Sequence, residues 1–127
     1  MNLVLRSGVD LVDVHRIAGL VEAGGDTFVS DVWTEGERAY CEGVPERLAG
    51  RWGAKEAAMK AIGLGFPDVS FRDIEVTSSV GHQPRLHLHG AAAAAAEALG
   101  LSDWSVSLSH EGGLAVAFVI GTGTSTR

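Results

Sequence analysis

Hydrophobic and polar residues recur along the first half of the chain with the spacing of one strand and three helices. Residues 3–12 are rich in aliphatic and β-branched side chains and predict a buried strand that ends near Asp10 or Leu11. Three helical patterns follow, each beginning after a capping residue or a proline and ending at a glycine. They run from residue 14 to Gly24, from Thr34 to Gly43, and from Glu46 to Ile62.

In the second half, polar and apolar residues alternate with the period of strands, and an alanine-rich helix that ends at Gly100 separates two pairs of strands. The first pair is joined by a turn at Gly81–Pro84 and the second by a glycine-containing connection at residues 111–113. The four strands are predicted at residues 69–76, 85–89, 104–110 and 114–120. This order predicts an α+β fold in which helices pack on an antiparallel sheet, with one domain at residues 1–121 and a flexible tail at residues 122–127.

Composition and charge limit the possible functions. The chain has 127 residues, of which 46% are hydrophobic and 20% charged, as in an ordinary globular domain. Its net charge of −6 argues against nucleic-acid binding through bulk positive charge. The single cysteine, Cys41, excludes an intrachain disulfide and fits a reducing cytosol. No apolar stretch approaches the roughly 20 residues of a membrane span, and the N-terminus lacks a signal-peptide pattern. We therefore expect a cytoplasmic protein with no nucleic-acid or membrane partner.

An acidic residue at the end of the predicted N-terminal strand is the first candidate for chemistry. The neighbours of Asp10 in the motif GVDLV are apolar, and an unpaired carboxylate in such surroundings would cost several kcal/mol. A bound cation or metal ion would remove that cost. The alternatives are a helix cap or a buried ion pair, which would give Asp10 a structural role only.

The long predicted helix carries charged residues away from its core-facing side. At about 100° per residue, Glu56 and Lys60 share the side opposite the core, and Arg51 and Lys55 form a neighbouring pair at i and i+4. The alternative to a functional role is a solvent-exposed ion pair, because Glu followed by Lys at i+4 is a favoured surface combination. The core-facing residues are Ala54, Ala57, Ala58, Ala61 and Ile62.

A third candidate is His110, beside the C-terminal hairpin, with Ser107 and Ser109 at alternate positions. A serine hydrolase needs its nucleophile and base to converge, and the chain has no G-x-S-x-G motif. A metal site formed by His87, His89 and His110 is another possibility, since histidines at i and i+2 on a strand share a face. The simpler interpretation is that these histidines lie on the surface.

Three motifs in a fixed order narrow these alternatives. They are GVDLV at residues 8–12, RWGAKEAAMKA at residues 51–61 and SLSH at residues 107–110 before a closing hydrophobic strand. Together they resemble the AcpS-type 4′-phosphopantetheinyl transferases, the holo-acyl-carrier-protein synthases, and the resemblance covers nearly the whole chain. It implies the fold of that family and an enzyme that transfers the phosphopantetheine arm of coenzyme A to a serine of apo-acyl carrier protein. Mg²⁺ is the implied cofactor, and adenosine 3′,5′-bisphosphate is the implied product.

The resemblance also implies roles for individual residues. Asp10 and Glu56 match metal-binding carboxylates, and two are sufficient because Mg²⁺ takes one or two protein carboxylates with water and phosphate oxygens. Lys60, one turn beyond Glu56, matches a residue that acts with it in catalysis by contacting a phosphate oxygen. For the base that accepts the serine proton, Glu56, Glu111 and a metal-bound water all stay open. The residues that match coenzyme A contacts are Arg51, Lys55, Lys60, Gly65, Pro84 and His110.

The resemblance further implies partners. Family members are homotrimers with active sites between subunits, so we expect self-association through apolar faces of the C-terminal strands. Arg16 and Leu20 match the surface that docks the carrier protein, although residues 22–26 lack the basic residues common in the family. The carrier could serve fatty-acid, polyketide or peptide synthesis. Two other hypotheses remain: a catalytically silent module that binds coenzyme A or a carrier protein, and a metal-dependent phosphohydrolase.

Overall fold

The computed structural model describes residues 1–78 and 83–126. Five strands and four helices follow one another in the predicted order, with a short 3₁₀ helix, η1, before the second strand. The predicted turn at Gly81–Pro84 lies partly outside the described residues. The elements are β1 (Asn2–Asp13), α1 (Val14–Val32), α2 (Glu35–Cys41), α3 (Pro45–Ile62), η1 (Phe71–Asp73), β2 (Ile74–Thr77), β3 (Arg85–Leu88), α4 (Gly90–Ala98), β4 (Leu101–Glu111) and β5 (Leu114–Ser125).

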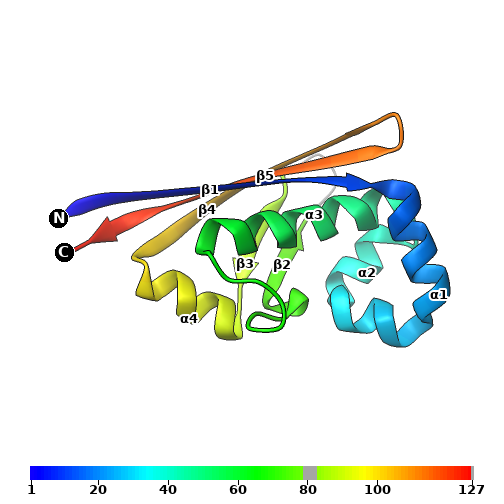
Figure 1. The fold of residues 1–127 in the computed structure, drawn as a ribbon, viewed down its shortest axis with the longest axis horizontal. Coiled ribbons are helices and arrows are strands. Elements are labelled where there is room, and N and C mark those ends of the chain that lie inside the picture. The colour runs from blue at the N-terminus through cyan, green and yellow to red at the C-terminus, as the bar shows by residue number, and fades with distance from the viewer. Residues whose placement is uncertain (79–82, 127) are drawn as a thin grey trace.

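The strands form two antiparallel sheets. The larger sheet has the order β1-β5-β4, and β2 pairs with β3 in a separate hairpin. Figure 1 shows the helices gathered on one face of the long sheet, with α3 lying against it. The predicted α+β fold with helices packed on an antiparallel sheet is confirmed. No helix among the described residues is long and apolar enough to cross a membrane.

Small residues bring α3 very close to the sheet. A Cβ atom on Gly8 of β1 would lie 1.8 Å from the carbonyl oxygen of Ala57, a contact that no side chain could make. A Cβ atom on Gly53 would lie 3.2 Å from the side chains of Val12 and Ala117. The close approach of β1 and α3 therefore depends on glycine and alanine, and it sets Asp10, two residues beyond Gly8, beside the second half of the helix.

The helix boundaries follow the predicted capping residues, with one addition. Thr34 and Glu37 form the predicted capping box, and Gly63 caps α3 in the left-handed conformation with a φ of 79°. Gly25 interrupts α1 where the sequence predicts its end, with φ 65° and ψ −158°. A second helical segment then continues to Val32, because its apolar residues pack into the core cluster around Trp33.

Two predictions of local structure are wrong. The predicted strand at residues 69–76 begins only at Ile74, because Ser70 and Asp73 form a capping box that starts η1 instead. The predicted flexible tail at residues 122–127 is structured up to Ser125 as the end of β5. It pairs there with residues 2–5 of β1, so the two chain ends hold each other in the sheet.

The N-terminal strand is buried on one face only. Its outward-facing side chains Leu3, Leu5 and Leu11 keep 76%, 63% and 66% of their surface exposed. Val9, also exposed, pairs directly with exposed Phe118 of β5. The predicted buried strand thus has an uncovered apolar face in a single chain, because the helices cover only the other face of the sheet.

Candidate active site

Asp10, Glu56 and Lys60 come together where β1 crosses α3. The Lys60 ammonium donates a hydrogen bond to the backbone carbonyl of Val9 at 2.8 Å and lies 3.2 Å from Asp10 Oδ1. The side chain of Lys60 is 55% exposed and that of Asp10 18%. A carboxylate and an ammonium that are 50 residues apart in the sequence therefore share one partly open site.

Glu56 lies on the same side of α3 as Lys60, one turn earlier, and its carboxyl interacts electrostatically with Asp10 and Lys60. Burial raises the pKa of Glu56, and the negative charge of Asp10 raises it further. The positive charges of Lys60 and Arg16 oppose this shift. The two acids thus repel each other across the site, and a divalent cation between them would relieve that repulsion.

The donor set of this site fits Mg²⁺. Asp10 and Glu56 supply carboxylate oxygens, the ligands that Mg²⁺ prefers. Among the described residues, no three or more His, Cys, Asp or Glu side chains form a group that could hold a metal ion. A cation bound here would therefore take most of its ligands from water or substrate, as Mg²⁺ commonly does.

A second cluster lies on the other side of α3, around Arg51. At about 100° per residue, Arg51 projects nearly opposite to Glu56 and Lys60. Its guanidinium carbon lies 4.3 Å from the ring centroid of Tyr40, and its Nη2 donates a hydrogen bond of 2.7 Å to Ser78 Oγ. Arg51 is only 6% exposed, and its Nε has no hydrogen-bond partner among the described residues.

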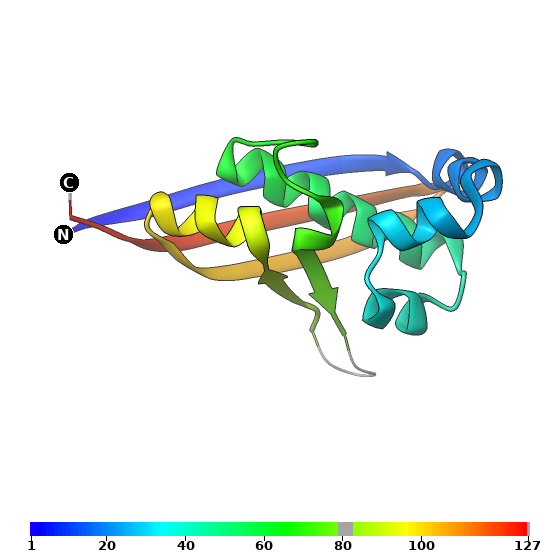
Figure 2. The ribbon, with the colours of Figure 1, turned by 90° about the horizontal axis from the view of Figure 1, so that it is seen from below.

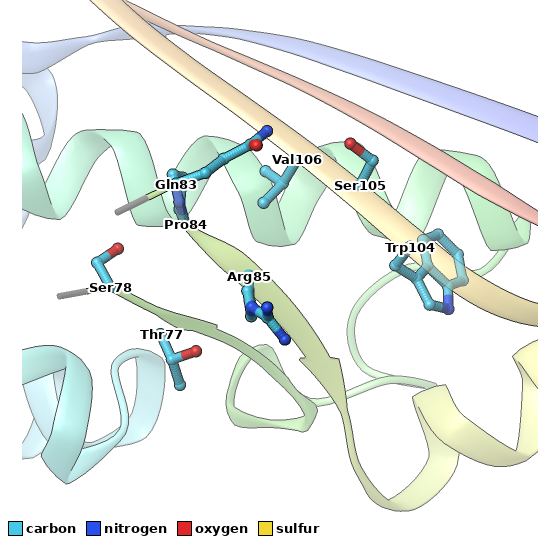
Figure 3. A pocket seen from close by; sticks show the side chains of 8 residues that line it. All are labelled: Thr77, Ser78, Gln83, Pro84, Arg85, Trp104, Ser105 and Val106. Atoms are coloured by element: carbon cyan, nitrogen blue, oxygen red, sulfur yellow. The ribbon is translucent and has the colours of Figure 1, made fainter. Parts of the chain in front are cut away.

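A cavity of about 720 Å³ opens next to Ser78, between the β2–β3 hairpin and β4. Figure 3 shows its lining, with Pro84 and Arg85 on the hairpin side and Trp104 and Val106 on the β4 side. Pro84, which the resemblance places beside coenzyme A, is one of the residues that line this cavity. The cavity is open and half polar, so it suits a large, charged ligand better than a small apolar one.

Lys55 does not lie in either open site, which corrects the expectation that it contacts coenzyme A. Its side chain is fully buried, and its ammonium donates three hydrogen bonds: to Glu37 Oε1 at 2.7 Å, to the carbonyl of Phe71 at 2.9 Å and to that of Ile74 at 2.5 Å. Burial lowers the pKa of Lys55, and the Glu37 carboxylate opposes that shift. All three N–H donors are occupied, so none is free for a ligand.

The remaining predicted residues lie around these two clusters. His110 is exposed on β4, and its pairing with Ala115 puts it on the face of the sheet that also carries Asp10. β1 and β4 are opposite edges of that sheet, and Figure 2 shows α3 lying between β1 and the hairpin. Gly65 is exposed just beyond α3, Arg16 is exposed on α1, and Leu20 is half-buried.

The alternative metal site formed by three histidines is not present. His87 bonds Thr77 at 2.9 Å across the β2–β3 hairpin, and His89, just beyond β3, bonds Glu75 at 3.0 Å. His110 lies on the other sheet, and the described residues contain no metal-binding group that includes it.

Sequence reasoning missed Tyr40, Ser78 and the second role of Glu37. Tyr40 and Ser78 contact Arg51 from segments 11 and 27 residues away, and no local pattern reveals such contacts. Glu37 is visible in the sequence as a capping residue, but its pairing with Lys55 depends on the packing of α2 against α3.

The chain resembles known proteins along most of its length. The model of the 4′-phosphopantetheinyl transferase superfamily matches residues 6–119. The holo-[acyl-carrier-protein] synthase of Herpetosiphon aurantiacus is 46% identical over 127 residues, covering 94% of this chain and 100% of that protein. That of Gloeobacter violaceus is 46% identical over 118 residues, covering 90% and 89%. The crystal structure of the Helicobacter pylori synthase in complex with coenzyme A matches with a TM-score of 0.81 and 28% identity, over 91% of this chain and 98% of that one.

Proposed function

Because the chain belongs to the 4′-phosphopantetheinyl transferase superfamily, we propose that it transfers the phosphopantetheine arm of coenzyme A to a serine hydroxyl of apo-acyl carrier protein. The observation that carries the proposal is the meeting of Asp10, Glu56 and Lys60 at the crossing of β1 and α3. A transferase that breaks a pyrophosphate needs positive charge and metal-binding oxygens at one point, and this group offers both. A cytoplasmic location goes with this proposal, since the one cysteine, Cys41, is a free thiol.

In the proposed reaction the serine oxygen attacks the phosphorus that carries the pantetheine arm, and the bond to the bridging oxygen breaks. Adenosine 3′,5′-bisphosphate leaves with that oxygen. Asp10 and Glu56 would hold Mg²⁺, which supplies a Lewis acid for the pyrophosphate oxygens. Lys60, held beside Asp10, donates to a phosphate oxygen as a point charge. The serine proton passes to a base, and the candidates among the residues of this chain are the carboxylates of Glu56 and Glu111.

The nucleotide part of coenzyme A is assigned to the cluster around Arg51. Arg51 is already oriented by Tyr40 and Ser78, and the neighbouring cavity has Pro84 on its rim. An arginine held in place loses little entropy when it binds a phosphate. His110 adds a second donor from β4. We assign Gly65, just beyond α3, to backbone contact with the pantetheine arm.

The site has an acidic half, formed by Asp10, Glu56 and Lys60, and a nucleotide half, the cluster around Arg51. In one chain these halves lie on opposite sides of α3, so we propose that each active site is completed by a second subunit of a homotrimer. The uncovered apolar face of the sheet supports this assembly, since contiguous exposed apolar surface marks an interface. β1 contributes more to that face than the sequence suggests, because its exposed leucines lie beside exposed Phe118 of β5.

The direct test is mass spectrometry of an apo-acyl carrier protein after incubation with the protein, coenzyme A and Mg²⁺. We expect the carrier to gain the mass of one phosphopantetheine on its serine, because that group is the part of coenzyme A that moves. A carrier in which the serine is replaced by alanine is the control. No mass gain across several carriers would overturn the proposal in favour of a silent binding module, and release of phosphopantetheine without a protein acceptor would identify a phosphohydrolase.

Carrier docking through α1 gives a second prediction. Arg16 is exposed and close enough to influence Glu56 electrostatically, so an acidic carrier bound beside it would present its serine to the metal site. We expect Arg16→Ala to raise the KM for carrier protein about tenfold with little change in the KM for coenzyme A. Steady-state kinetics with each substrate varied in turn measures both values.

The matched control is Arg72→Ala, which removes another exposed arginine, on η1. We expect this variant to keep the wild-type KM for both substrates. Equal effects of the two substitutions would mean that only net charge matters, and a change confined to coenzyme A would place Arg16 in the cofactor site instead. Both results contradict a docking role.

A further inference from the structure

Glu37 and Lys55 form a buried ion pair that the proposed reaction does not use. The carboxylate and the ammonium are 2.7 Å apart, and both side chains have 0% exposure. The pair lies between α2 and α3, the helices that carry Tyr40 and Arg51. Replacing such a pair by apolar residues is often neutral or stabilising in other proteins, because charges are costly to bury. Stability alone is therefore a weak reason for its presence.

The hydrogen bonds of the pair point to a different role. One edge of β2 pairs with β3. On the other edge, the carbonyl of Ile74 accepts a hydrogen bond from Lys55, and the N–H of Val76 donates one of 2.9 Å to Glu37 Oε2. These are the backbone groups that a neighbouring strand would satisfy in a larger sheet. The two charged side chains take the place of that strand.

This edge of β2 leads directly to the rim of the cavity. Thr77 ends the strand, Ser78 follows it, and both line the cavity. Ser78 accepts the hydrogen bond from Arg51, which lies one helical turn from Lys55 on the same side of α3. One turn of α3 therefore makes two contacts with this segment: Lys55 bonds the backbone of β2, and Arg51 bonds Ser78, just beyond the end of β2.

We propose that the Glu37–Lys55 ion pair is a positioning device for coenzyme A: by holding the free edge of β2, it keeps Ser78 and the cavity rim in register with Arg51. Neither residue touches the substrate. The identity of the ligand rests on the proposed function, whereas the anchoring of β2 does not. The ion pair thus connects α3, the helix that carries Glu56, to the cavity beside Ser78.

Two variants separate positioning from stability. Lys55→Met removes the cation and leaves Glu37 buried and unpaired, so it should lower both the melting temperature and the affinity for coenzyme A. The double variant Glu37→Gln/Lys55→Met leaves no buried charge, so we expect its melting temperature to recover most of the loss, short of the wild type because two backbone carbonyls still lack a donor. The bonds from Lys55 to Ile74 and Phe71 are still missing, so the KM for coenzyme A should stay about tenfold raised while kcat changes less than about twofold. Recovery of that KM together with the melting temperature would overturn the proposal.

Val32→Ala is the control for general destabilisation. Val32 is buried in the core cluster around Trp33, and its truncation should lower the melting temperature without changing the KM for coenzyme A. An equal rise in KM for this control would show that any loss of stability weakens binding, and would also overturn the proposal.

Hydrogen exchange supplies a readout that does not depend on activity. In Lys55→Met, the peptide covering β2 should exchange at least about tenfold faster than in the wild type, while β1 and β5 keep their protection. Unchanged exchange in β2 would contradict the anchoring role whatever the enzyme does. Calorimetric titration with coenzyme A alone completes the set. If the wild type binds coenzyme A but transfers nothing, the proposed function fails while the effect of the pair on binding can still be measured.

Discussion

Glu56→Gln should lower kcat/KM for phosphopantetheine transfer by at least about a thousandfold, because a metal ion that stabilises a phosphoryl-transfer transition state is worth several kcal/mol. The amide keeps the size of the side chain and removes its charge. Glu56 is half-buried on the side of α3 next to Asp10, and burial together with the charge of Asp10 raises the pKa of its carboxyl, so a neutral amide should be tolerated in the folded chain. The melting temperature should therefore be unchanged or slightly higher. Transfer kinetics and thermal melting measure the two effects.

Asp10→Asn should lower kcat/KM to a similar extent, since both substitutions remove one of the two carboxylates that would hold Mg²⁺. The matched control is Glu46→Gln, which changes an exposed glutamate in the first turn of the same helix, about 15 Å along the axis from Glu56. That variant should keep full activity. Normal turnover of Glu56→Gln or Asp10→Asn at ordinary Mg²⁺ concentrations would show that the two acids do not form the metal site.

The residues of the acidic half of the site are identified through the three-motif resemblance, because the local pattern alone leaves a helix cap or an ion pair open as alternatives. Gly8, Asp10, Glu56 and Lys60 stand in motifs whose spacing defines a strand and one side of a helix. The glycines at the crossing allow the two elements to pack closely. The position of this group follows from the sequence pattern once the crossing of β1 and α3 is known.

The burial of Lys55 and its pairing with Glu37 could not be predicted from the same pattern. A helical wheel separates Lys55 from Glu56, but it cannot tell whether α2 or solvent lies on that side. The capping box at Thr34 accounts for Glu37 completely in local terms, so nothing in the sequence signals a second partner. Long-range packing, which no local spacing encodes, decides that Lys55 is structural while Lys60 is exposed.

The outward face of β1 shows a different limit. Aliphatic residues on both faces of a strand predict burial on both faces, yet the isolated chain covers only one. This uncovered apolar face is what the proposed homotrimer would bury. The division of the site by α3 supports the same proposal, in which a neighbouring subunit completes each active site.

Mixing two inactive variants tests that conclusion directly. Glu56→Gln disables the acidic half of the site, and Arg51→Leu should disable the nucleotide half by removing the guanidinium that Tyr40 and Ser78 hold. If each site combines halves from two neighbouring subunits, a trimer that contains both variants has one site with both halves intact. Trimers carrying two different affinity tags, purified through both, should then regain about a third of wild-type activity.

The control pairs Glu56→Gln with Asp10→Asn, which damage the same half and should not restore activity in any combination. The expected recovery comes only from combining intact halves of two subunits, because neither substitution adds a new functional side chain. If the whole site lay within one chain, every subunit of a mixed trimer would keep its own defect, and activity would stay at the level of the separate variants. That outcome would contradict the shared site. Glu56 and Arg51 of one chain would then both have to contact one coenzyme A molecule, although they lie on opposite sides of α3.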